Sequence, residues 1–193
     1  DKETYAHLTE SYDVRLYDDF TALLQSPIDL VVEAATVEVV QEHLLAVLQE
    51  KDAIIISIGA FVDEAFFARA KEKAKAYGKQ LYLPSGAIGG LDLVQNVLAT
   101  KTVDEVTLTT RKPAHTLTDD RLEEATLVFD DSAKAAIGKY PRNMNVSIAL
   151  SLAGIGFEDT RVQLIADPNL DKNIHQIKLH GAFGEATFTI ANH

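Results

Sequence analysis

Between Ile28 and Leu83 the sequence alternates short apolar runs with segments of helical periodicity, and this alternation restricts the fold more than any other feature. The run from Ile28 to Ala35 is interrupted only by Asp29 and Glu33, as expected of a strand that is covered on both faces. The residues that follow place apolar side chains at the spacing of one helical face: Val37, Val40, Leu44, Leu45 and Leu48. We therefore predict a strand followed by an amphipathic helix.

The same strand-and-helix unit then repeats. Ala53 to Ile58 is a second apolar run, Asp63 stands at a helix N-cap position, and Gly78 ends the helix that follows. Leu81 to Leu83 begins a further strand. Strands that alternate with helices at this spacing form right-handed βαβ crossovers, which indicates a parallel sheet.

Two more elements precede this region. Val14 to Tyr17 is predicted as a strand, and Asp19 to Gln25 as a short helix that Ser26-Pro27 ends. The first half of the chain is therefore predicted to be an incomplete Rossmann-like parallel sheet.

Three segments of small residues follow the predicted strands: Glu33 to Thr36, Ser57 to Ala60 and Ser85 to Gly90. Parallel α/β sheets bind ligands beyond the carboxyl ends of their strands, and small residues let a flat ligand approach the backbone. Each segment alone is as well explained as a tight turn between strand and helix. Their common position favours a ligand cleft.

The second half changes character, with strands that are not separated by obligatory crossover helices. Predicted strands are Val103–Thr110, Ala125–Phe129, Arg161–Ala166, Ile174–Leu179 and Ala186–Ile190, and predicted helices are Leu91–Ala99, Ser132–Tyr140 and Met144–Ala153. Such grouping indicates an α+β domain with a mixed or antiparallel sheet. We predict a dinucleotide-binding domain over residues 1–86 and a substrate and dimerisation domain over residues 87–193.

Composition excludes several classes of function. The chain has no cysteine, so disulfides, thiolate metal sites and thiol catalysis are excluded. Its net charge of −11 argues against nucleic acid, and no apolar run approaches the ~20 residues of a membrane-spanning helix. The polar start shows no signal peptide, and we expect a cytoplasmic protein.

Few residues are candidates for chemistry. His175 follows a polar turn whose Asp167, Asn169 and Asn173 are able to orient an imidazole for proton transfer, although a strand-edge histidine explains it nearly as well. Arg111-Lys112 at a strand end suits a substrate carboxylate or merely a solvated strand end. No metal-ligand motif appears, and we expect the acidic pairs Asp119-Asp120 and Asp130-Asp131 on loops.

Five segments together resemble the ordered signature of L-aspartate dehydrogenases. They are Ser57–Ala60, Ser85–Asp92, Thr109–Pro113, Tyr140–Val146 and Asp167–His175, and they span nearly the whole chain. The resemblance implies NAD(P)-dependent oxidation of L-aspartate to iminoaspartate, which hydrolyses to oxaloacetate and ammonia or feeds NAD biosynthesis. It implies a catalytic role for His175, and it implies cofactor contacts at Ala34, Ala35, Ser57, Ile58, Gly59, Ala87 and Asn145.

The resemblance also implies that Lys112 and Asn173 meet the substrate and that the cofactor is NAD or NADP. It further implies a homodimer paired through the second sheet, whose apolar face would need a partner: Val106, Leu108, Val162, Leu164 and Ile177.

The chain departs from this family at its ends. We expect a preceding strand, glycine-rich GxGxxG turn and helix that hold the pyrophosphate, with Asp1 near the ribose-reading position, and a further segment after His193. Without the glycine-rich turn, the chain alone is expected to bind NAD(P) weakly or not at all. Two alternatives stay open: a non-catalytic relic that keeps the small-ligand pocket, and a dehydrogenase of the dihydrodipicolinate reductase type.

Overall fold

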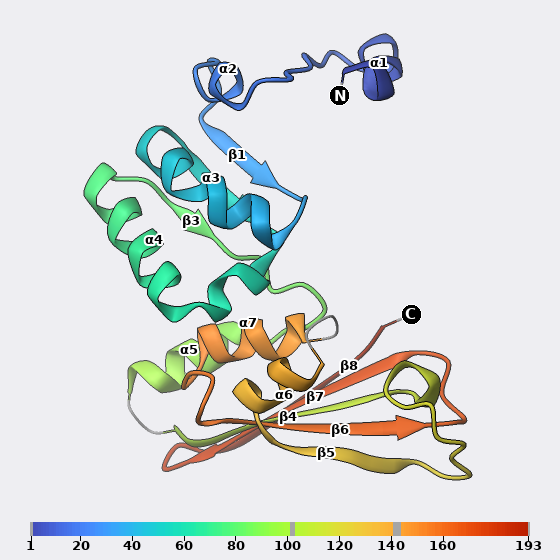
Figure 1. The fold of residues 1–193 in the computed structure, drawn as a ribbon. Helices are drawn as coiled ribbons and strands as arrows, with labels where there is room; N and C mark the ends of the chain where they lie inside the picture. Colours follow the sequence, from blue (N-terminus) through green and yellow to red (C-terminus); the bar gives the residue numbers. More distant parts are fainter. Residues whose placement is uncertain (1, 101–102, 141–143, 193) are drawn as a thin grey trace. The chain divides into compact units, whose positions relative to one another are not determined.

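A computed structural model describes residues 2–100, 103–140 and 144–192, and it divides the chain into two compact units. The first unit ends at Leu83 and the second begins at Pro84, close to the boundary at residue 86 that the sequence suggests. Asp1 and the centre of the Tyr140–Val146 segment lie outside the described residues. The positions of the two units relative to each other are not determined, and each is described by itself (Figure 1).

The first unit is a three-stranded parallel sheet with helices. Its elements in chain order are α1 (Lys2–Ser11), α2 (Phe20–Leu24), β1 (Leu30–Glu33), α3 (Val37–Glu50), β2 (Asp52–Ile55), the 3-10 helix η1 (Ile58–Val62), α4 (Glu64–Tyr77) and β3 (Leu81–Tyr82). The strands pair in the order β1-β2-β3, with Leu30 opposite Asp52 and Ala53 opposite Leu81. The predicted parallel sheet is confirmed from β1 onward.

The predicted strand at Val14 to Tyr17 is wrong. These residues have no regular secondary structure and pair with no strand of the described chain. Their apolar side chains alternate with polar ones, but no sheet edge stands beside them. A strand needs such an edge to satisfy its backbone groups. The helix predicted next is confirmed as α2, which Asp19 caps by accepting hydrogen bonds from the backbone of Thr21 and Ala22.

The two long helices of the first unit each begin at a capping side chain, of which Asp63 was predicted and Thr36 was not. The Thr36 hydroxyl accepts a hydrogen bond from the amide of Val39 at the start of α3, and Asp63 accepts one from Phe66 at the start of α4. Gly78 ends α4 in the left-handed conformation, with φ of 64°. The apolar stripe predicted for α3 contributes Val40, Leu44 and Leu48 to the core. In α4, Phe66 and Ala70 of the expected stripe are buried, whereas Tyr77 at its end is 50% exposed.

The second unit is a five-stranded sheet with three α-helices. Its elements are α5 (Leu91–Ala99), β4 (Val103–Pro113), the 3-10 helix η2 (Ala114–Thr116), β5 (Thr126–Ser132), α6 (Ala133–Lys139), α7 (Asn145–Ala153), β6 (Thr160–Asp167), β7 (Asn173–Gly181) and β8 (Gly184–Asn192). The strand order is β5-β6-β4-β7-β8. Among the described strand pairs of this sheet, β4 and β6 run parallel and the others are antiparallel, which confirms the predicted mixed sheet.

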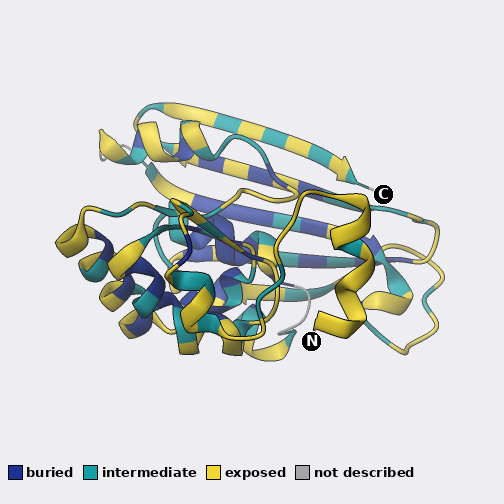
Figure 2. Cartoon of the chain, turned by 90° about the horizontal axis from the view of Figure 1, so that it is seen from above, coloured by how far each residue is buried: buried dark blue, intermediate teal, exposed yellow. Residues whose placement is uncertain are grey.

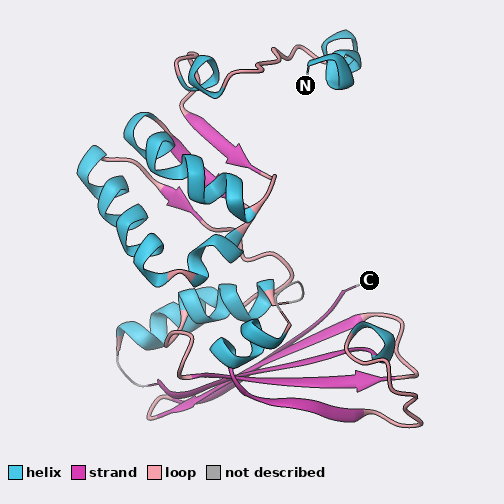
Figure 3. Ribbon diagram, viewed as in Figure 1, coloured by secondary structure: helices cyan, strands magenta, loops and turns pink. Residues whose placement is uncertain are grey.

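One face of this sheet carries the core, and within the second unit α5, α6 and α7 lie on that side (Figure 3). Buried side chains alternate along β6 and β7, as expected of strands with one covered face. Along the edge strand β8 exposed and intermediate positions alternate instead (Figure 2).

The apolar face that was expected to need a partner subunit is covered by the chain itself. The exposed fractions of its five predicted residues are 1% or less: Val106, Leu108, Val162, Leu164 and Ile177. Helices α6 and α7 contact β6 on this side. The prediction that this face needs a partner subunit was wrong, because α6 and α7, although short, pack on it from within the same chain.

Asp130 and Asp131 also differ from expectation. They belong to β5 rather than to a loop, and Asp130 forms a bidentate ion pair with Arg161 of β6, at 2.6 and 2.8 Å, on the side of the sheet opposite the core. This pair and the hydrogen bond from Gln163 hold the pKa of Asp130 below its usual value. No helix in the described part of the chain is long and apolar enough to cross a membrane.

Candidate functional site

In the first unit, a buried carboxylate joins the two strand-end loops. Glu33, at the carboxyl end of β1, is 9% exposed. Its Oε1 accepts hydrogen bonds from the Ala35 amide at 2.6 Å and the Ser57 hydroxyl at 2.8 Å, and its Oε2 accepts one from the Ser57 amide at 3.0 Å. A buried carboxylate is costly unless such donors replace water. Glu33 therefore fixes the chain after β1 against the chain after β2.

This arrangement defines what the predicted cofactor loops offer to a ligand. Ala34 and Ala35 are exposed, while Ser57 and Gly59 are partly buried. A β-carbon at Gly59 would lie 3.0 Å from the Val37 side chain, so this close approach favours glycine. Ile58 is only 6% exposed and belongs to the core, which leaves only its backbone for contact with a ligand.

Small residues at the carboxyl ends of two adjacent parallel strands fit a flat cofactor such as a dinucleotide. Most residues of these loops have small side chains, and none of them carries a positive charge: Ala34, Ala35, Ser57, Ile58 and Gly59. The amides of Ala35 and Ser57 are engaged by Glu33, so those two donors serve the protein's own carboxylate.

A cavity of about 410 Å³ lies beside the first of these loops, between α2, α3 and the sheet. Its lining is mostly apolar and includes Val31, Leu44 and Ile55. Among its lining residues, Glu33 and His43 are the ionisable ones, and the His43 ring stacks on Phe20 with centroids 4.2 Å apart. Such a lining fits an apolar part of a ligand better than a phosphate group.

In the second unit, His175 lies on the core side of the sheet, directly opposite Thr110 of the neighbouring strand. His175 is 5% exposed and Thr110 is 3% exposed. The Thr110 hydroxyl and Nδ1 of His175 are 3.0 Å apart and share a hydrogen bond. Lys112 is two residues further along β4, on the same face, and is 9% exposed.

These surroundings hold His175 in its neutral form. Burial lowers the pKa of the His175 imidazole below its usual value, and the positive charge of Lys112 lowers it further. Burial likewise lowers the pKa of the Lys112 ammonium. A neutral imidazole beside a cation is suited to accept a proton from a group that the cation helps to hold.

Asp167, one of the three residues of the polar turn expected to orient the ring, is engaged elsewhere. Asp167 forms an ion pair with Arg111 at 2.6 Å and accepts a hydrogen bond from the Asn169 amide at 2.9 Å. Its side chain is thus committed to the strand end and the turn. Arg111 is engaged by the same pair, so Lys112 rather than Arg111 is the cation beside the histidine.

The loop that contains Ala87 lies over the edge strand β8. The Asn192 side chain donates a hydrogen bond to the Ala87 carbonyl at 3.0 Å, and a β-carbon at Gly90 would lie 3.0 Å from the Phe188 ring. In the ladder between β7 and β8, Asn192 stands opposite Asn173, and Ile190 stands opposite His175. The structure therefore brings Ala87, Asn173, His175 and Lys112 to one end of the second sheet.

Asn145, the remaining predicted cofactor contact, begins α7 and is exposed. Residues 141–143, which precede Met144, lie outside the described residues, and within the described part of the chain no contact joins Asn145 to His175. The structure thus places it at a helix start without bringing it to the other predicted residues.

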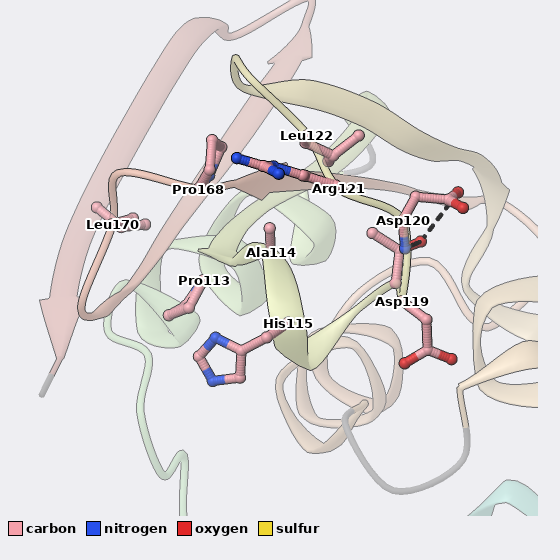
Figure 4. Close-up of a pocket in the computed structure, with 10 residues that line it drawn as sticks. Pro113, Ala114, His115, Asp119, Asp120, Arg121, Leu122, Pro168 and Leu170 are labelled. Carbon is pink, nitrogen blue, oxygen red and sulfur yellow. Dashed lines mark hydrogen bonds between the residues drawn. The ribbon is translucent and has the colours of Figure 1, made fainter.

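A second cavity of about 400 Å³ lies in the second unit, beyond the ends of β4 and β6 (Figure 4). Pro113, His115, Arg121 and Pro168 line it, and Arg121 extends toward Pro168. None of the predicted site residues lines this cavity. The described residues contain no group of three or more side chains arranged to hold a metal ion.

The sequence gives no role to two residues of the site. Thr110 shares a strand face with Lys112 two residues later, and this period-2 relation was the available signal. Glu33 stands in the predicted strand-end segment Glu33 to Thr36, but its hydrogen bonds were not predicted, although an acidic residue at the end of a buried strand indicates nearby donors.

Comparison with protein families matches each unit to a separate model. Residues 2–84 match "Homoserine dehydrogenase, NAD binding domain", and residues 92–193 match "Aspartate dehydrogenase, C-terminal". The second match covers more than half of the chain.

Individual relatives agree with these matches. L-aspartate dehydrogenases of Nitrosopumilus maritimus and Methanocella arvoryzae are each 40% identical to this chain, over 88% and 85% of its length. The chain spans 66% and 65% of the length of those two relatives. The crystal structure of aspartate dehydrogenase from Thermotoga maritima matches 92% of this chain and 73% of its own, with a TM-score of 0.79 and 38% identity.

Proposed function

Because the chain belongs to the aspartate dehydrogenase family, we propose that the protein oxidises L-aspartate with NAD or NADP to iminoaspartate, which hydrolyses to oxaloacetate and ammonia. The observation that carries this proposal is the buried group of His175, Thr110 and Lys112 at one end of the second sheet. This group supplies a cation that attracts a carboxylate of a dicarboxylate amino acid, and beside it a neutral base that takes up a proton from the substrate amine.

We assign the binding of the substrate to Lys112 and Asn173. The Lys112 ammonium attracts a substrate carboxylate, and a carboxylate next to it offsets the cost of keeping the charge buried. Asn173, at the start of β7, is two residues from His175 and offers an amide to the same substrate. These two residues would orient the amino-bearing carbon toward His175.

We assign the proton transfer to Nε2 of His175, because Nδ1 is bonded to Thr110. Nε2 accepts the proton that leaves the substrate amine as the carbon–nitrogen double bond forms. It then returns this proton to the imine nitrogen and, neutral again, takes a proton from the water that attacks the imine carbon. When bound, NAD(P)⁺ supplies the acceptor for the hydride from the substrate. The proposed cofactor contacts are the loops at Ala34-Ala35 and Ser57-Ile58-Gly59, together with Ala87 and Asn145.

Three further properties belong to this proposal through the family resemblance: a homodimer, a cytoplasmic location and a part in NAD biosynthesis. The dimer no longer rests on the apolar face named above. The opposite side of the second sheet carries polar side chains such as Gln163, Gln176 and Lys178, and it is the side that α6 and α7 leave uncovered.

The test is an assay of the full-length gene product for formation of reduced cofactor from L-aspartate, with NAD⁺ and NADP⁺ in parallel. L-aspartate should be oxidised in preference to L-alanine and L-glutamate. His175→Ala should lower kcat by about 10²–10⁴-fold, the usual worth of positioned proton transfer, and leave cofactor affinity nearly unchanged. His180→Ala is the matched control, because His180 is exposed on the same strand.

Absence of aspartate oxidation by the full-length protein would contradict the proposal. It would favour the non-catalytic relic, or, if a dihydrodipicolinate substrate were reduced instead, the reductase alternative.

A further inference from the structure

Thr110 is the described residue whose side chain bonds the ring of His175. The two residues are direct partners in the antiparallel ladder of β4 and β7, and both are almost fully buried. Their side chains therefore face each other in a fixed place, with Oγ1 and Nδ1 3.0 Å apart. This bond sets the rotation of the imidazole about its bond to the β-carbon, because a flipped ring would lose it.

From this geometry, we propose that Thr110 is the positioning residue of the site: its hydroxyl holds Nδ1 of His175 and thereby presents Nε2 as the nitrogen that exchanges protons. The inference rests on the proposed function, which makes His175 the acid–base group. Asp167, the carboxylate of the turn before His175, is committed instead to Arg111 and to the Asn169 amide.

A hydroxyl in this position has a chemical consequence that a carboxylate would not have. A carboxylate at Nδ1 stabilises the imidazolium and raises its pKa, whereas a hydroxyl donates to a bare Nδ1 or accepts from Nδ1–H with little preference for charge. When Nε2 is the base, the neutral ring carries its proton on Nδ1, so Nδ1–H donates to the Thr110 hydroxyl, and the same hydrogen bond persists after Nε2 takes up a proton. It fixes orientation without favouring the charged form, which suits a histidine that starts neutral.

The simpler explanation is that Thr110 and His175 merely satisfy each other as a buried polar pair. The chain offers a matched control for this. Thr109, the preceding residue of β4, faces the other side of the sheet, and its hydroxyl donates to Oε1 of Gln163 on β6, also at 3.0 Å. Both bonds join neighbouring strands over the same distance, but only the first involves a titratable ring.

The first measurement is made on the 193-residue chain labelled with ¹⁵N, and it requires no enzyme activity. Signals of the His175 ring nitrogens are assigned by their loss in His175→Gln. Thr110→Val keeps the shape of the side chain but removes the hydroxyl, so the Nδ1 resonance should move toward that of a histidine in water. Thr110→Ser should restore the Nδ1 resonance, and Thr109→Val should leave it unchanged. An unchanged Nδ1 resonance in Thr110→Val would overturn the proposal.

The second measurement uses the kinetics of the full-length protein. Thr110→Val should lower kcat for aspartate about three- to tenfold, the worth of one hydrogen bond, with little change in KM. Thr110→Ser should recover most of kcat, and Thr109→Val should leave it intact. Thr110→Ala replaces Thr110→Val in both measurements if the valine variant does not fold.

The outcomes separate this inference from the proposed function. A shifted Nδ1 resonance with unchanged kcat in Thr110→Val would reduce Thr110 to a structural pair and overturn the positioning role. If instead His175→Ala kept normal kcat, the assignment of His175 in the proposed function would fail, whatever the Nδ1 resonance showed.

Discussion

The two units hold their proposed ligand loops by different means. In residues 1–83 a single buried carboxylate, Glu33, draws the chain after β1 and the chain after β2 together through three hydrogen bonds. In residues 84–193 the loop from Gly86 to Gly90 lies over β8, where it meets Phe188 and Ile190 and accepts one bond from Asn192. The first loop pair thus depends on one polar residue and the second loop on contact with a strand. Substitutions in the first loop pair should therefore act through lost hydrogen bonds, and substitutions in the second loop through altered contact with β8.

The largest effect is expected where the second loop meets β8. Gly90 has φ of 78°, and its added β-carbon would lie 3.0 to 3.1 Å from three atoms of the Phe188 ring. Gly90→Ala should lower the free energy of unfolding by about 2–3 kcal/mol, through backbone strain and displacement of the ring. Thermal or urea unfolding measures this.

Gly86→Ala is the control for that substitution. Gly86 has φ of 65° but no atom within 4 Å of an added β-carbon, so only the backbone cost of about 1–2 kcal/mol applies. Equal losses in the two variants would show that β8 does not support the loop.

The next effect concerns the hydrogen bonds of Glu33 in the first unit. In Glu33→Gln an NH₂ group, which cannot accept a hydrogen bond, replaces one carboxylate oxygen. At least one of the donors of Ala35 and Ser57 therefore loses its acceptor. The unfolding free energy should fall by about 1.5–3 kcal/mol, as for a hydrogen bond to a charged group. Amide hydrogen exchange at Ala35 and Ser57 should quicken, while the second unit keeps its exchange rates.

Glu72→Gln makes the same chemical change at an exposed position of α4 and should leave stability within about 0.5 kcal/mol. If Glu33→Gln behaved like Glu72→Gln, the Glu33 hydrogen bonds would not be what holds the first loops.

How far the sequence predicts this molecule depends on whether the deciding contacts are local. The helix caps at Thr36 and Asp63 act within three residues, and the sequence suffices to place both helices. The strand predicted at Val14 failed because its pattern is local but its sheet partner does not exist among the described strands. The covered face around Leu164 was misjudged because strand periodicity identifies an apolar face without identifying what packs on it.

The candidate site shows the same limit. His175 and Lys112 stand out by residue type, and the resemblance places them in order along the chain. The bond from Thr110 to His175 spans 65 positions in the sequence, and the pairing of Glu33 with Ser57 spans 24. Such partners follow from strand register, which depends on the whole sheet.

The smallest effect concerns the pKa of His175. It sharpens the contrast between the buried carboxylate Glu33 of the first unit and the buried neutral imidazole of the second. Burial, and then the charge of Lys112, lower its pKa below the usual 6.5. The ring should therefore remain neutral as the pH falls through 6.5 and take up its proton only at lower pH. Titration of the 193-residue chain, followed by NMR of the ring, measures this.

Lys112→Met should move the midpoint of that titration upward, because the neighbouring cation is gone, but burial should still keep it below 6.5. A midpoint that does not move would show that the Lys112 charge does not reach the ring.

The hydrogen bond from Asn192 to Ala87 also bears on how the protein assembles, because it joins positions 105 residues apart. Contacts of such long range form late in folding, after the chain between them has lost its freedom. During synthesis residues 28–83 are made before β4 begins, whereas the loop at Ala87 waits for β8 to leave the ribosome. The Glu33 loops should therefore mature early, and the second loop should acquire its shape only when translation of β8 is finished.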